Sequence, residues 1–173
     1  MAELVKNTKE ARRRRKHVHF GLKEEVNRAL MAALQGKGYS DVVDVGFKAI
    51  KGIDGTDEYC FDGMFIATRG NADFLFVGEV RQYLEGHDVR DAEADRRKLV
   101  SRLEGVKAGT SPMGHRMYDA QVLFLQKLQD AEVVLYVGGA TVLPDACAKA
   151  AEVHCLLVQP SGGRYQVTFP DAV

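Results

Sequence analysis

Apolar positions recur along the chain with two different periods, which predict where helices and strands lie. Leu22, Val26 and Leu30 recur at helical spacing and predict a helix of about four turns, which a GKG sequence ends. The apolar runs at 64–66 and 74–77 predict two strands, and the Gly-Asn pair between them is typical of a hairpin turn. The first half of the chain therefore predicts a helix followed by paired strands.

The second half of the chain predicts two helices, then a strand, a short helix and two more strands. The corresponding residue ranges are 88–105, 122–128, 131–140, 144–153, 154–160 and 164–169. Residues 41–50 are a weaker strand candidate, and the segment 51–58 that follows predicts a turn-rich loop. This order predicts an α/β fold, in which a single mixed central β-sheet is flanked by helices on both faces and the last strand lies at an edge.

Composition narrows the class of protein. The chain has 173 residues, of which 46% are hydrophobic and 28% charged, values that fit one globular domain, predicted at 21–173 after a polar arm at 1–20. The formal net charge is zero, so any attraction to polyanions has to be local. The sequence has no apolar run long enough to span a membrane, and an odd set of three cysteines suits a reducing compartment. We therefore expect an intracellular protein with no membrane partner.

The polar arm contains the strongest local charge in the sequence. Five consecutive cations repel one another unless they meet an anion, and they are Arg12, Arg13, Arg14, Arg15 and Lys16. Each phosphate that such a cation neutralises releases counterions, which favours a contact with nucleic acid. A solvated tail is the other interpretation of this arm.

Two carboxylates lie in the most apolar part of the chain, where burial ought to exclude them. Asp62 precedes the first of the paired strands and Glu79 lies near the end of the second. Side chains alternate along a strand, so Glu79 and Arg81 emerge on one face, where Asp62 can join them. Buried carboxylates have to be paired, protonated or bound to a metal, and hard oxygen ligands of this kind suit Mg²⁺ or Mn²⁺. The sequence therefore predicts a candidate site for a divalent cation at the end of these strands.

The same residues resemble the motif of the PD-(D/E)XK nuclease superfamily. Asp62 stands before a strand-turn-strand unit, and Glu79-Val80-Arg81 stands where that family has (D/E)-x-K before a helix. The resemblance implies a restriction-endonuclease-like fold and metal-dependent hydrolysis of phosphodiester bonds in nucleic acid. It also implies that Asp62, Glu79 and the Val80 carbonyl bind the metal, and that Glu25 on the upstream helix assists them.

The chain departs from the motif at one position, because Arg81 replaces the lysine. Arginine stays protonated and can clamp a phosphate, but it cannot serve as a general base. Lys98 on the following helix is the nearest lysine that could reach the site. Two functions stay open: a nuclease, intact or weakened, and an inactive nuclease-fold protein that binds nucleic acid or serves as a structural subunit of a larger assembly. A structural salt bridge among Asp62, Glu79 and Arg81 is the remaining interpretation of these three residues.

Overall fold

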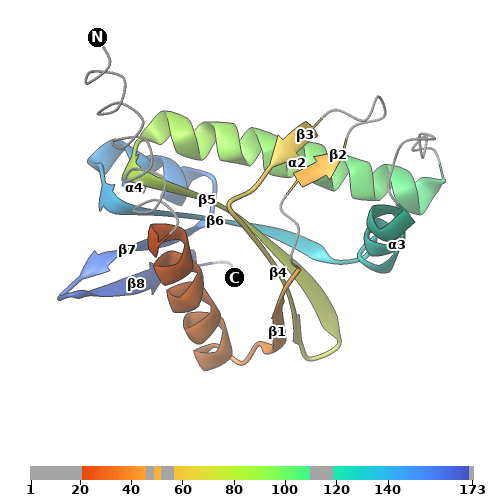
Figure 1. The fold of residues 1–173 in the computed structure, drawn as a ribbon, viewed down its shortest axis with the longest axis horizontal. Coiled ribbons are helices and arrows are strands. Elements are labelled where there is room, and N and C mark those ends of the chain that lie inside the picture. Colours follow the sequence, from red (N-terminus) through yellow and green to blue (C-terminus); the bar gives the residue numbers. More distant parts are fainter. Residues whose placement is uncertain (1–20, 46–48, 52–56, 110–118, 172–173) are drawn as a thin grey trace, which may run out of the picture.

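The computed structural model describes residues 21–45, 49–51, 57–109 and 119–171. These residues form one main β-sheet with helices on both sides (Figure 1). The predicted basic arm at 1–20, with its five cations, lies outside the described residues.

The main sheet has six strands and mixed direction. Its spatial order is β1 (Ser40–Asp44), β4 (Gly63–Arg69), β5 (Ala72–Leu84), β6 (Glu132–Val142), β7 (Leu156–Ser161) and β8 (Arg164–Thr168). The first three strands pair antiparallel, β5, β6 and β7 pair parallel, and β8 closes the sheet antiparallel to β7. The predicted mixed α/β sheet is therefore confirmed, and its last strand lies at an edge as expected.

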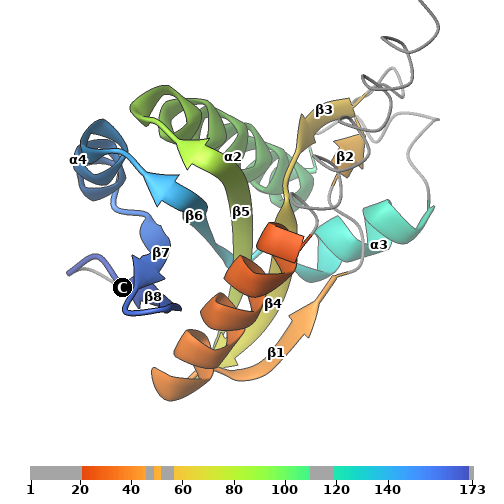
Figure 2. The ribbon, with the colours of Figure 1, turned by 60° about the vertical axis from the view of Figure 1, so that its left-hand side comes forward.

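Helices cover the sheet from two sides, as Figures 1 and 2 show for the two flanks of β5. Residues 21–36 are helical and form the first helix, which packs on one face. Three helices pack on the opposite face, namely α2 (Gly86–Ala108), α3 (Asp119–Lys127) and α4 (Pro144–Glu152). No helix in the described ranges is long and apolar enough to cross a membrane.

Polar side chains fix where α2 begins. Glu85 and Asp88 form a capping box, in which the Asp88 carboxylate accepts a hydrogen bond from the Glu85 backbone N–H at 3.0 Å. The Gly86 N–H donates to Asp145 Oδ2 at 2.9 Å, so the first turns of α2 and α4 are joined. Gly109 ends α2 with a left-handed φ of 67°, which glycine adopts without strain. The start of α2 is thereby held at the end of β5.

Two local predictions are wrong. Part of the predicted loop at 51–58 is extended, because β2 (Ala49–Lys51) and β3 (Asp57–Cys60) pair with each other apart from the main sheet. Strands this short show too few alternations to be recognised from sequence. The position of Tyr83 just after the apolar strand residues also predicts a core side chain, whereas Tyr83 is 64% exposed.

The ring of Tyr136 fills the space above two glycines that face each other in β4 and β5. Gly63 pairs with Gly78, and Gly78 pairs with Tyr136 on β6. A Cβ atom added to Gly78 would lie 1.9 Å from Tyr136 Cζ, and one added to Gly63 would lie 1.8 Å from Tyr136 Oη. The hydroxyl donates to Asn27 Oδ1 on the first helix at 2.7 Å, and burial raises the pKa of Tyr136 well above its usual value. This contact joins the first helix to three strands.

Gly78→Ala is expected to destabilise the protein by about 3 kcal/mol or more, because the added methyl overlaps the Tyr136 ring in a packed core. Urea denaturation measures this free energy of unfolding. Gly36→Ala adds the same methyl on the first helix with no atom within 4 Å, so its effect should stay within about 0.5 kcal/mol.

A double-mutant cycle tests the contact itself. Gly63→Ala meets the Tyr136 hydroxyl oxygen, whereas Gly78→Ala meets the ring carbons. Tyr136→Phe should therefore reduce the cost of Gly63→Ala and leave the cost of Gly78→Ala unchanged. If Gly63→Ala costs as much in the Tyr136→Phe background as in the wild type, the packing described for Tyr136 is contradicted.

Candidate functional site

The hairpin of β4 and β5 places the two predicted carboxylates next to each other. The Asp62 N–H donates to the Gly78 carbonyl at 2.7 Å, immediately beyond the Gly63–Gly78 pair, so Asp62 lies beside Glu79. The Val80 N–H donates to Asp62 Oδ2 at 2.8 Å and fixes the orientation of that carboxylate. Both side chains are largely buried, with 11% of Asp62 and 13% of Glu79 exposed.

Arg81 binds several carboxylates at once. It lies two residues after Glu79 on β5, and its Nη2 forms an ion pair with Glu79 Oε1. Its Nε lies 3.4 Å from Asp88 Oδ1, and its Nη1 lies 3.9 Å from Asp62 Oδ2. The structure therefore brings together Asp62, Glu79 and Arg81, and it adds Asp88 from the first turn of α2.

A second cation, Lys23, reaches the site from the first helix. Its Nζ forms an ion pair with Asp62 Oδ1. Lys23 lies one turn before Asn27, so the hydrogen bond between Asn27 and Tyr136 also sets which way Lys23 faces. Sequence reasoning missed this lysine, although its four-residue spacing from Asn27 and its place beside the apolar stripe of the helix were available signals.

The carboxylate pair opens into a pocket of about 270 Å³ between the end of β5 and α2. Its lining residues are Cys60, Phe61, Asp62, Glu79, Arg81, Asp88, Asp91, Ala92 and Asp95. The three aspartates of α2 lie at spacings of three and four residues, which places them on one face of the helix. An acidic run at a helix start is ordinarily explained by the helix dipole, whereas this one forms one wall of a strongly acidic pocket.

Burial and crowding change the protonation of Glu79. Burial raises the pKa of Glu79 to about 7, and the neighbouring Asp62 carboxylate adds to this rise. The positive charges of Arg81 and Lys23 oppose it. Glu79 therefore exchanges its proton near neutral pH, where an ordinary glutamate is fully ionised.

Two other predicted residues lie away from the carboxylate pair. Glu25 is exposed and lies close enough to Tyr165 on β8 to contribute to the raised pKa of that tyrosine. Glu25 therefore points away from the metal ligands that the resemblance implies it assists, because it is about 200° around the helix from Lys23, the residue that faces Asp62. Lys98 binds Asp95 at 2.7 Å and is not among the residues that line the pocket.

The donor set suits a hard divalent cation only in part. Among the described residues, no group of three or more His, Cys, Asp or Glu side chains is arranged to hold a metal ion. Mg²⁺, however, commonly takes one or two carboxylates and completes its coordination with water and substrate phosphate. Asp62 and Glu79 could supply that pair, and the Val80 carbonyl remains the third predicted ligand.

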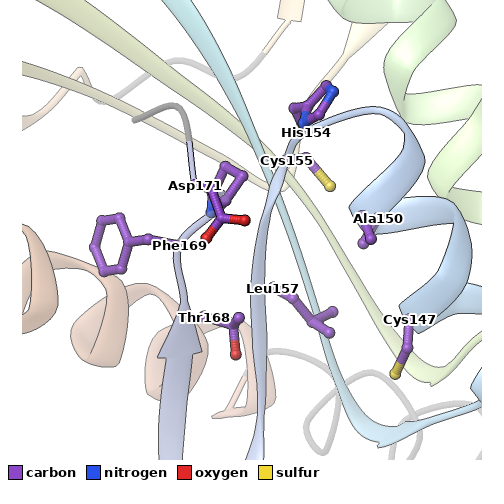
Figure 3. Close-up of a pocket in the computed structure, with 10 residues that line it drawn as sticks. Cys147, Ala150, His154, Cys155, Leu157, Thr168, Phe169 and Asp171 are labelled. Atoms are coloured by element: carbon purple, nitrogen blue, oxygen red, sulfur yellow. The ribbon is translucent and has the colours of Figure 1, made fainter.

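A second pocket, of about 350 Å³, lies between α4, β7 and the residues after β8 (Figure 3). Cys147, His154 and Cys155 lie along it, and Asp171 lies on its opposite wall. Burial raises the pKa of Cys155 to about 12, so this thiol stays protonated and is neither a nucleophile nor a ready metal ligand. The residues predicted to bind a divalent cation, Asp62 and Glu79, lie in the acidic pocket and not in this one.

The raised pKa of Glu79 predicts a pH-dependent stability. The folded protein holds this proton more tightly than the unfolded chain, so the contribution of Glu79 to stability is full below pH 4.5 and is lost as the pH rises through about 7. Glu79→Gln keeps a neutral side chain at every pH. The unfolding free energy of the wild type should therefore fall relative to that of Glu79→Gln by about 3 kcal/mol across this range.

Urea denaturation at a series of pH values measures this difference. Glu24→Gln removes one exposed carboxylate from the first helix and serves as the control. The raised pKa of Glu79 is contradicted if the difference in unfolding free energy between wild type and Glu79→Gln changes with pH no more than the difference between wild type and Glu24→Gln.

Comparisons of this chain with protein-family models, with curated proteins and with solved structures found no match. The residues that could act at the pocket are therefore named from its geometry and charge. They are Asp62, Glu79 and Arg81, together with Lys23 and Asp88.

Proposed function

We propose that this chain is a metal-dependent, nuclease-like protein of the PD-(D/E)XK type, which hydrolyses phosphodiester bonds in nucleic acid. The observation that carries the proposal is the buried pair of Asp62 and Glu79, which opens into the acidic pocket. Two carboxylates in one small volume are costly as structure. A divalent cation in the pocket would offset this cost and give the pair a chemical use.

A restriction-endonuclease-like fold is part of this proposal. Its support is the order of the elements, in which the first helix precedes the antiparallel strands β1, β4 and β5. Asp62 stands directly before β4, Glu79 lies on β5, and α2 leads to β6, which pairs parallel to β5. The Ala-rich helix α4 between β6 and β7 agrees with the closing half of the smaller members of that superfamily.

The charge of the pocket explains why a metal would be needed. Five carboxylates line it, whereas Arg81 is the one cation among the lining residues. A phosphodiester is an anion, so it cannot approach these carboxylates unless a cation lies between them. Asp62, Glu79 and the Val80 carbonyl would hold Mg²⁺ or Mn²⁺. When bound, such an ion polarises the phosphodiester, lowers the pKa of an attacking water and neutralises the leaving oxygen.

The residues of the chain would orient the reaction. The Val80 N–H holds one oxygen of Asp62. Arg81 would present two N–H groups of its planar guanidinium to a phosphate. Arg81 cannot take a proton from water, because it stays charged. Glu79 has to be ionised to bind a cation, so cation binding should strengthen as the pH rises through about 7.

A second candidate function is favoured by the contacts of Arg81. Its guanidinium already pairs with Asp62, Glu79 and Asp88, and Lys23 pairs with Asp62. These cations neutralise the carboxylate pair without a metal. The chain would then be an inactive nuclease-fold protein that binds nucleic acid or serves as a structural subunit of a larger assembly.

We expect the full chain to cleave nucleic acid in the presence of Mg²⁺ or Mn²⁺. Single-stranded, duplex and branched DNA and RNA, separated on denaturing gels, are the substrates to test. Asp62→Asn and Glu79→Gln should each reduce cleavage by about a hundredfold or more, because each weakens the binding of the metal.

Asp73→Asn is the matched control, since it removes an exposed carboxylate at the opposite end of β5 and should leave the rate unchanged. Cleavage that persists in Asp62→Asn would overturn the site assignment. Cleavage that appears only in Arg81→Lys would identify an inactive protein derived from a nuclease.

The inactive alternative predicts binding without a divalent ion. Nucleic acid should then bind through the basic arm, with an affinity that falls steeply as salt is raised. Replacing all five cations at 12–16 by glutamine in the full chain should abolish this binding in fluorescence anisotropy. Binding that requires Mg²⁺ and survives the replacement would exclude this alternative.

A further inference from the structure

Lys23 takes the one oxygen of Asp62 that the other contacts leave open. The Val80 N–H and the Arg81 guanidinium both approach Asp62 Oδ2, whereas Lys23 pairs with Oδ1. Both oxygens of this carboxylate are therefore occupied. A divalent cation that binds Asp62 has to share an oxygen with an existing partner or displace that partner.

The two cations at Asp62 differ in how firmly they are held. Arg81 bridges three carboxylates with its planar guanidinium. If it loses its contact with Asp62, its ion pairs with Glu79 and Asp88 still hold it in place. Lys23 is a point charge on a flexible four-carbon stem, and among the described residues its carboxylate partner is Asp62. The Lys23 side chain is 27% exposed and that of Arg81 45%, so both reach solvent, and the number of carboxylate partners is what distinguishes them.

The backbone beneath Lys23 does not depend on this ion pair. Leu22 and Val26 beside it are buried, and Asn27 holds the helix to Tyr136 by a hydrogen bond. The Lys23 side chain can therefore leave Asp62 while the first helix stays in place.

We propose that Lys23 is an internal counter-ion, which a divalent cation displaces from Asp62 and which then binds a phosphate of the nucleic acid. This inference rests on the proposed function and assigns a positioning role that the sequence motif leaves vacant at Arg81. Like charges repel, so a metal on Asp62 weakens the ion pair between Lys23 and the same carboxylate and favours its displacement. A phosphate that enters with the metal offers the displaced ammonium a new anionic partner.

The first test measures Mn²⁺ affinity in the full chain by electron paramagnetic resonance of the free ion, at pH 8. Lys23→Met should bind Mn²⁺ about tenfold more tightly than the wild type, because no cation competes for Asp62. Lys23→Arg should return the affinity to the wild-type value or below it. A lysine that only holds Asp62 in place would give the opposite sign, since its loss would weaken metal binding.

The second test measures binding of a fluorescent DNA oligonucleotide by anisotropy, with and without Ca²⁺. Ca²⁺ should raise the DNA affinity of Lys23→Met about tenfold less than it raises that of the wild type, because the variant has no ammonium to meet the phosphate. Arg28→Met removes an exposed cation from the same helix and is the control in both tests. Lys23→Gln, which retains a polar side chain, provides a second variant, and thermal denaturation verifies that each variant is folded.

The outcomes separate this inference from the proposed function. Mn²⁺ binding by the wild type that is not tightened in Lys23→Met overturns the inference and leaves the proposed function standing. Binding that appears only in Lys23→Met overturns both for the natural chain, because the divalent cation then fails to displace Lys23 from Asp62. Absence of Mn²⁺ binding in both proteins overturns both. A loss of Ca²⁺-dependent DNA affinity no larger than in Arg28→Met overturns the phosphate contact.

Discussion

The packing of Tyr136 against Gly63 and Gly78 is the contact on which the rest of the structure depends. Its ring crosses β5 at Gly78 and reaches β4 at Gly63, so both strands have to carry glycine at these positions. Its hydroxyl meets Asn27 and so fixes the rotation of the first helix about its axis. One buried side chain therefore couples the spacing of three strands to the orientation of a helix.

The site is a consequence of that coupling. Asp62 and Glu79 lie one position beyond the glycine pair that the tyrosine ring covers. Lys23 lies one turn before Asn27 and meets Asp62 as a result. The same contact therefore determines where the carboxylates are and which cation reaches them.

Much of the carboxylate pair could be predicted from the sequence because it depends on local rules. Glu79 and Arg81 are two residues apart on a strand, so they share a face. A two-residue turn at Gly70 and Asn71 pairs Arg69 with Ala72, and counting along both strands from this pair brings Asp62 beside Glu79. The strand and helix order followed from periodicity in the same way.

Contacts between separate elements could not be predicted, since they depend on helix packing that periodicity does not specify. Lys23 reaches Asp62 because of the rotation of the first helix, and the exposure of Glu25 follows from the same rotation. Asp91 and Asp95 face the pocket because α2 lies along the end of β5, whereas their spacing alone is equally typical of a solvated helix face. The exposure of Tyr83 depends in the same way on packing between elements, which the strand pattern does not report.

The unequal connections of β5 have a consequence for folding. β5 joins β4 through a tight turn, which is a fast local event. Its pairing with β6 brings Phe74 to Glu132 across a long stretch of chain that contains α2 and α3, and this costs more chain entropy. We therefore expect the hairpin to close first, with the acidic pair already adjacent and no aromatic ring above the glycines. Repulsion between like charges opposes this early step, so the hairpin should open and close repeatedly until β6 arrives and makes it permanent.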